Sequence, residues 1–220
     1  KIRLALSRQL YFCSMQVRPP IILRTLMPGL TWKVKTSEKV LFVTFDDGPH
    51  PEITPQVLDI LDQYQAKATF FCVGENVEKY PETYQEILRR GHQTGNHSHN
   101  HLKGWLTDNK TYFSNIEKAS KWIESKLFRP PYGKITPRQS YYLKQQYQIV
   151  MWSAISYDFD SNITPEQCLK NVINNSSSGT IAVFHDSVKS AKNMLYALPK
   201  YLETMSAIGY AFKSLDNRIK

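Results

Sequence analysis

Two adjacent carboxylates, Asp46 and Asp47, end an apolar run in the segment Thr-Phe-Asp-Asp-Gly-Pro at 44–49. Neighbouring ionised carboxylates repel each other, and a cation bound to one of them removes that cost while keeping the other ionised as a base. Three histidines follow within residues 97–101. One carboxylate with two imidazoles makes a divalent-metal site that keeps open positions. With a second, unliganded carboxylate beside it, this combination is suited to metal-assisted hydrolysis.

The histidine cluster offers two ligand pairs. His97 and His101 are four residues apart, so one helical turn places both imidazoles on the same side. His97 and His99 share a side only on a strand, and they remain a competing pair. Because Gly95 and Asn96 just upstream favour a loop or turn, we prefer His97 and His101 as the ligands.

Four further polar positions follow apolar runs later in the chain. Arg129 precedes two prolines that stiffen the backbone, and a fixed arginine beside acidic groups orients one of them and lowers its pKa. Tyr132, which follows the two prolines, could offer its backbone N–H to a developing oxyanion. Asp158 and His185 each follow a predicted strand. A carboxylate paired with a histidine raises the imidazole pKa and makes it a usable general acid.

The elements that must position these residues alternate along the chain. Apolar runs typical of strands cover 39–45, 68–73, 149–152, 180–184 and 210–213, and residues 93–96 are a short strand candidate leading into the histidines. Amphipathic stretches predict helices over 55–61, 81–90, 108–126, from about 136, and over 164–174 and 191–205. Thr54 is expected to cap the first of these helices, with Pro55 at its first position. About seven strand–helix units in strict alternation argue for a parallel sheet, open or closed into a barrel.

Every polar cluster falls at the C-terminal end of a predicted strand, where barrels and open α/β sheets place their sites. Residues 1–37 stand outside the repeat and are expected to pack against the barrel as a basic extension. We expect residues 38–220 to form a single catalytic domain.

The 220-residue chain carries a net charge of +9, and seven basic residues precede the first acidic one, Glu38. This charge could attract an anionic membrane face or a wall polymer, or it could serve solubility alone. No nucleic-acid-binding motif accompanies it, so no nucleic-acid partner is expected. Arg8 and Gln9 interrupt the first apolar stretch, so no signal peptide is clear. We expect a monomer that is cytoplasmic or associated with the cell envelope.

Three cysteines, Cys13, Cys72 and Cys168, are an odd number at wide spacing. They indicate neither a disulfide framework nor a thiolate metal site. Cys72 lies in an apolar run and is expected to be a buried free thiol.

These elements, in this order, resemble the polysaccharide deacetylases of the NodB-homology family, carbohydrate esterase family four. The resemblance covers about residues 39–215. It rests on five motifs: Thr-Phe-Asp-Asp-Gly-Pro at 44–49, His-Ser-x-x-His at 97–101, Arg-Pro-Pro-Tyr-Gly at 129–133, Ser-Tyr-Asp-Phe at 156–159 and Val-Phe-His at 183–185.

The resemblance implies a distorted (β/α) barrel with seven strands. It also implies that Asp47, His97 and His101 hold a divalent metal ion. Zinc is the first expectation, with cobalt, nickel or manganese as alternatives.

The resemblance further implies a role for each remaining motif residue. Asp46 would be the general base, oriented by Arg129. His185 would be the general acid, tuned by Asp158. The backbone N–H of Tyr132 would join the metal in stabilising the oxyanion.

The expected reaction is removal of acetyl from a nitrogen or oxygen of an acetylated glycan, with an N-acetylglucosamine-containing substrate favoured. Two positions depart from the family pattern: Phe159 stands where tryptophan is usual, and Ile155 where an acidic residue is common. This departure motivates an alternative, a glycan-binding pseudoenzyme. A hydrolase of another non-peptide C–N bond is a third reading.

Overall fold

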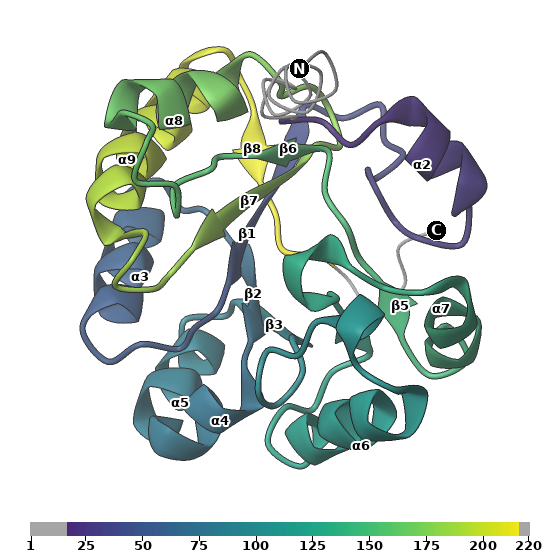
Figure 1. The fold of residues 1–220 in the computed structure, drawn as a ribbon. Helices are drawn as coiled ribbons and strands as arrows, with labels where there is room; N and C mark the ends of the chain where they lie inside the picture. The colour runs from purple at the N-terminus through teal and green to yellow at the C-terminus, as the bar shows by residue number, and fades with distance from the viewer. Residues whose placement is uncertain (1–16, 216–220) are drawn as a thin grey trace, which may run out of the picture.

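The computed structural model describes residues 17–215, and its centre is a parallel sheet curled into an open barrel (Figure 1). The strands along the sheet follow the order β5-β4-β3-β2-β1-β7-β6, and β8 pairs separately with β1. All these pairings are parallel. The bounds are β1 Val40–Asp46, β2 Ala68–Cys72, β3 Gln93–Asn96, β4 Leu127–Phe128, β5 Gln148–Ile149, β6 Ala154–Ile155, β7 Ile181–His185 and β8 Ala211–Phe212.

Helices surround the sheet on the outside (Figure 1). They are α2 Ile21–Leu26, α3 Ile53–Gln63, α4 Gly74–Lys79, α5 Pro81–Arg89, α6 Asn109–Ser120, α7 Pro137–Leu143, α8 Pro165–Ile173 and α9 Ala191–Ala207. Two short 3-10 turns, η2 Gly104–Leu106 and η3 Pro131–Gly133, lie in the loops after β3 and β4. The continuous path of seven strands, with β8 added beside β1, confirms the expected distorted (β/α) barrel with seven strands in a single domain.

The central strand β1 is buried along its whole length, from Val40 to Asp46. A strand with sheet neighbours on both sides and helices over the sheet needs a continuous apolar sequence rather than an alternating one. Its Phe45 ring stacks on Phe70 of β2 at 4.9 Å and lies 6.1 Å from Phe184 of β7. The same apolar run therefore holds the sheet together and carries Asp46 to its C-terminal edge.

The first predicted helix begins earlier than expected, so the assignment of Thr54 as its cap is wrong. Helix α3 starts at Ile53 after Glu52, which makes no side-chain capping bond. Thr54 lies inside the first turn, and its hydroxyl donates to Asp186 at 2.6 Å. The same hydroxyl oxygen accepts from the backbone N–H of His50 at 2.8 Å, so the lone pair that a capping residue offers to a helix N–H is used by the preceding loop.

Other element boundaries differ from the predicted ones where tertiary contacts determine where an element begins or ends. Helix α6 ends at Ser120, not near residue 126, and the short elements α4 and β6 were not expected. Helix α4 begins where the backbone N–H groups of Gly74 and Glu75 donate to the carbonyls of Ser98 and His99, at 2.9 and 3.0 Å. These long-range bonds leave no periodic pattern in the local sequence.

The described part of the segment before β1, residues 17–37, contacts the barrel, whereas residues 1–16 of the predicted extension lie outside the described residues. Leu30 and Trp32 are both 6% exposed and belong to an apolar cluster with Phe128 and Ile149. Thr31 donates to the carbonyl of Ile149 at 2.9 Å and accepts from Met151 at 2.8 Å. The domain boundary at residue 37 stays a prediction.

Cys72 and Cys168 are buried free thiols, which confirms the expectation for Cys72. Cys13 lies outside the described residues. Within residues 17–215, no helix combines the length and the apolar character needed to cross a bilayer.

Candidate active site

The predicted site residues converge at the C-terminal edge of the sheet, although they are spread over 140 positions of the chain, from 46 to 185. A cavity of about 530 Å³ opens there. Six of the eight predicted residues line it: Asp46, Asp47, His97, His101, Tyr132 and His185. The other two, Arg129 and Asp158, are buried behind Asp46 and His185. Parallel strands bring their ends to one rim, and that is what assembles these groups.

Asp47, His97 and His101 form one group of ligand atoms that all lie within 4.8 Å of one another. Oδ1 of Asp47 is 3.2 Å from Nε2 of His101 and 3.8 Å from Nε2 of His97. One carboxylate and two imidazoles are a donor set that suits zinc and related divalent ions. The spacing and the chemistry of these three side chains therefore fit a single metal ion.

His97 is held in the tautomer that a metal ligand needs. Its Nδ1 lies 2.8 Å from the backbone carbonyl of Arg129, an oxygen that can only accept. The proton must therefore sit on Nδ1, which leaves the lone pair of Nε2 facing Asp47. Burial lowers the pKa of His97 to about 4, so the ring is neutral at ordinary pH.

The pKa of Asp47 is also set by its surroundings. Burial opposes ionisation of this carboxyl, but the hydrogen bond from His101 and the positive charge of His185 outweigh it and hold the pKa well below its usual range. The carboxylate is therefore ionised, as a metal ligand must be.

His99 does not join the group. Its Nε2 lies 3.6 Å from a carboxylate oxygen of Glu78, a contact on the other side of the loop. The structure thus brings together His97 and His101, the preferred pair, and not His97 and His99. The reason differs from the helical turn that their spacing suggested. The segment is a loop in which Ser98 has φ 62° and His101 has φ 54°.

Three residues of the site adopt left-handed backbone although none is glycine: Asp47 with φ 79°, His101 with φ 54° and Tyr132 with φ 59°. This conformation costs on the order of 1–3 kcal/mol for each such residue and persists only where surrounding contacts enforce it. At Asp47, Asn76 supplies such a contact, because its side-chain amide donates to the Asp47 carbonyl at 2.7 Å.

Asp46 accepts a hydrogen bond from a guanidinium nitrogen of Arg129 at 2.6 Å. The arginine is fully buried, and it also donates to Thr44 and to the carbonyls of Val150 and Met151. Its guanidinium carbon lies 4.0 Å from the ring centroid of Phe71. These contacts fix the position of Arg129, so the Asp46 carboxylate has a defined orientation at the cavity wall.

His185 is clamped by Asp158 through two hydrogen bonds. One carboxylate oxygen of Asp158 lies 2.7 Å from Nδ1 of His185, and the other accepts from its backbone N–H at 2.8 Å. Burial favours the neutral ring, but the negative charge and hydrogen bond of Asp158 outweigh it and raise the pKa of His185 to about 9. The imidazole is therefore protonated at neutral pH, with Nε2–H available to donate. Phe159 packs edge-on against this ring at 4.9 Å.

The loop after β4 turns sharply at Tyr132 and Gly133. In the hydrogen bonding of residues 17–215, the backbone N–H of Tyr132 has no acceptor, while the next two N–H groups bond back to Pro130 and Pro131. Gly133 has φ +64°, and a Cβ added there would lie 2.4 Å from the Trp152 ring. A glycine is therefore required at 133, and the turn it permits leaves the Tyr132 N–H available to a ligand.

Sequence reasoning missed Asp186, the buried carboxylate that follows His185. It accepts from the Gly48 backbone N–H at 3.1 Å and from the Thr54 hydroxyl at 2.6 Å. These bonds tie the loop that carries Asp47 to the end of β7. An acidic residue directly after an apolar strand was the available signal, and it was obscured by the neighbouring histidine.

A curled parallel sheet with a carboxylate–histidine metal group, an arginine-oriented carboxylate and a protonated histidine in one cavity defines a metal-dependent hydrolase. The sequence model of the polysaccharide deacetylase family matches residues 33–150. The chain belongs to that family, which confirms the resemblance drawn from its motifs and the carbohydrate deacetylase class of enzyme.

Comparison with individual proteins gives the same family assignment. The chain is 36% identical over 204 residues to a peptidoglycan-N-acetylglucosamine deacetylase of Bacillus cereus, covering 87% of this chain and 93% of the relative. It is 28% identical over 201 residues to a chitooligosaccharide deacetylase of Azorhizobium caulinodans, covering 86% and 94%. A solved peptidoglycan N-acetylglucosamine deacetylase superposes with a TM-score of 0.82 at 29% identity, over 90% of this chain and 95% of that one.

Proposed function

We propose that the protein is a zinc-dependent deacetylase that removes acetyl from N-acetylglucosamine units of peptidoglycan or of a related glycan. The observation that carries this proposal is the grouping of Asp47, His97 and His101 within 4.8 Å beside Asp46, which Arg129 holds at 2.6 Å. The relatives named for peptidoglycan and chitooligosaccharide support the substrate class.

Asp47, His97 and His101 would hold the metal ion. When bound, the ion acts as a Lewis acid that polarises the acetyl carbonyl and favours ionisation of water. Zinc fits this donor set, and cobalt, nickel and manganese ions also bind sites of nitrogen and oxygen ligands, with affinity rising from manganese to nickel.

The protein's own groups supply the proton transfers and the oxyanion contact. Asp46 takes a proton as water adds to the acetyl carbonyl carbon. The oxygen that becomes negative accepts a hydrogen bond from the Tyr132 N–H. His185 then gives its Nε2 proton to the amide nitrogen as the C–N bond breaks, which releases acetate and the free amine of the sugar.

Acetate release from chitin oligosaccharides and from peptidoglycan fragments, measured with and without added zinc, tests the proposal. Zinc-dependent release is the expected result. Binding of the oligosaccharides without release of acetate would instead favour the glycan-binding pseudoenzyme, whose motivation is Ile155 and Phe159 in the cavity wall.

Replacing a ligand is expected to weaken the metal site selectively. His101→Gln should lower zinc affinity by at least about 100-fold, since even the outer partners of metal ligands are worth about 10–100-fold. His99→Gln is the matched control, because His99 contacts Glu78 and lies outside the ligand group. Competition with a chelating dye measures both affinities. Equal zinc binding by His101→Gln and the unaltered protein would contradict the assignment.

The pH dependence of turnover should report the Asp158–His185 pair. His185 donates only when protonated, so kcat is expected to fall as pH rises through its pKa of about 9. Asp158→Asn removes the charge that raises this pKa, so the alkaline fall should move to lower pH by more than about one unit. Initial rates of acetate release between neutral and alkaline pH, at constant bound zinc, measure the shift. An unmoved alkaline limb would contradict the role of Asp158.

A further inference from the structure

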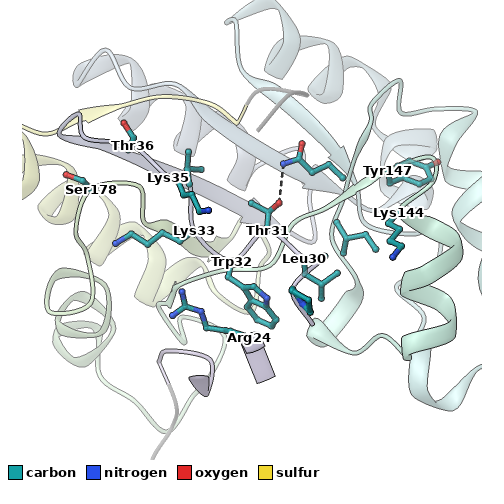
Figure 2. A pocket seen from close by; sticks show the side chains of 15 residues that line it. Arg24, Leu30, Thr31, Trp32, Lys33, Lys35, Thr36, Lys144, Tyr147 and Ser178 are labelled. Atoms are coloured by element: carbon teal, nitrogen blue, oxygen red, sulfur yellow. Dashed lines mark hydrogen bonds between the residues drawn. The ribbon is translucent and has the colours of Figure 1, made fainter. Parts of the chain in front are cut away.

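A second cavity, of about 810 Å³, lies between residues 24–36 and the barrel (Figure 2). Two bonds join this segment to the turn that precedes β7. The N–H of Val34 donates to Gly179 at 2.9 Å, and the Lys33 ammonium donates to the Ser177 hydroxyl at 2.7 Å. Gln148, at the start of β5, lines the other side. The cavity is thus at the N-terminal ends of the strands, the end of the barrel opposite the active site.

Four cationic side chains line this cavity: Arg24, Lys33, Lys35 and Lys144. They reach it from three segments, namely α2, the extended stretch before β1 and the end of α7 (Figure 2). No acidic side chain is among the described lining residues, and no ion pair within 17–215 involves any of the four.

The positive charges therefore repel one another without a counter-charge from the described part of the chain. The pKa of Lys33 is lowered, first by partial burial and then by repulsion from the positive charges of Arg18 and Arg24. Hydroxyl groups of Thr31, Thr36 and Ser178 also line the cavity, beside apolar and aromatic residues such as Trp32 and Tyr147. Lysine, arginine and hydroxyl donors together are the groups that proteins use to contact phosphate oxygens.

The shape of the cavity limits the kinds of anionic ligand that it can bind. Lys33 and Lys144 lie on opposite sides of the cavity (Figure 2). A ligand with anionic groups at intervals can contact both of them, whereas one small anion cannot. A hollow also accommodates a chain better than it accommodates the flat surface of a membrane.

We propose that the basic cavity lined by Arg24, Lys33, Lys35 and Lys144 binds a linear polymer that carries phosphate groups. This site is separate from the one that takes the acetylated glycan. It gives the cationic residues between 24 and 35 a function other than packing against the barrel.

Binding of the full chain to inorganic polyphosphate of defined length, measured by calorimetry at low and moderate salt, tests this proposal. The cavity variant combines Lys33→Gln, Lys35→Gln and Lys144→Gln. Its matched control combines Lys110→Gln, Lys118→Gln and Lys121→Gln, which removes the same amount of charge from the surface of α6 and its C-cap residue. The cavity variant should lose at least about tenfold in affinity and show a weaker salt dependence, while the control loses less than about twofold.

Equal losses in the two variants would overturn the proposal, since net charge alone would then explain the binding. Loss of binding to anionic vesicles in the cavity variant, without polyphosphate binding by the unaltered protein, would overturn it in favour of a membrane. Acetate release from an uncharged chitin oligosaccharide should be unchanged in both variants, which shows that they are folded. If the triple variant is unstable, the exposed pair Lys35→Gln and Lys144→Gln is compared with Lys110→Gln and Lys121→Gln.

Discussion

Asp46→Asn should lower kcat by about 10³-fold while leaving zinc bound. A general base contributes about 10²–10⁴-fold, and an amide cannot take the proton from water. The amide oxygen can still accept from Arg129, which donates at 2.6 Å in the unaltered protein, so the geometry of the site is preserved. Asp46 is not one of the three grouped ligand residues, so zinc content should not change.

The measurement is acetate release at saturating substrate, with bound zinc determined by elemental analysis on the same sample. Asp160→Asn is the matched control, because Asp160 lies on the loop of Asp158 and, within residues 17–215, its side chain bonds to Asn162 alone. Its kcat should stay within about twofold of the unaltered protein. Turnover by Asp46→Asn within tenfold of the unaltered protein would refute the assignment of the base.

The largest effect on stability is expected at Arg129. Arg129→Met should lower the free energy of unfolding by about 3–5 kcal/mol, because it leaves the buried Asp46 carboxylate without its cation. The carbonyls of Val150 and Met151 also lose their donor. In a chain of this size, the midpoint of thermal unfolding should fall by roughly 10 °C. Calorimetry or denaturant unfolding, with equal zinc loading, measures the change.

A double-mutant cycle separates the interaction energy between Arg129 and Asp46 from the contributions that each residue makes alone. Arg129→Met combined with Asp46→Asn should be less destabilised than the sum of the two single changes, because the unpaired charge is gone. Zinc should still bind to Arg129→Met, since His97 is oriented by the main-chain carbonyl of residue 129 and not by its side chain. Additive losses, or a loss of zinc in Arg129→Met, would contradict this account.

Most of the fold could be predicted from the sequence because most of its strands and helices have clear local sequence patterns. Residues 40–46 are one buried run, and the helix starts at Pro137 and Pro165 follow capping threonines. Elements such as β6 and α4 could not be predicted, because β6 has only two residues and α4 is anchored by carbonyls that are distant in sequence. Long-range contacts of this kind are not encoded in any single window.

The residues of the site could be predicted from the sequence, but the backbone conformation that positions them could not. The motifs named Asp47, His97 and His101, but spacing alone suggested a helical turn where the chain forms a loop. The left-handed conformation of Asp47 and Tyr132 depends on contacts made elsewhere, such as the one from Asn76. A non-glycine residue carries no local signal for such a backbone, because the sequence around it favours other conformations.

The strand order has a consequence for how the enzyme matures. The three ligand residues are complete by position 101, on the edge formed by β1, β2 and β3, whereas His185 comes from β7, which pairs with β1 across more than a hundred residues. During synthesis the amino-terminal strands emerge first. In a nascent chain, the three metal-ligand residues are therefore expected to be in place well before His185, which protonates the leaving group. Catalysis is expected only after the last third of the polypeptide has packed against the earlier strands.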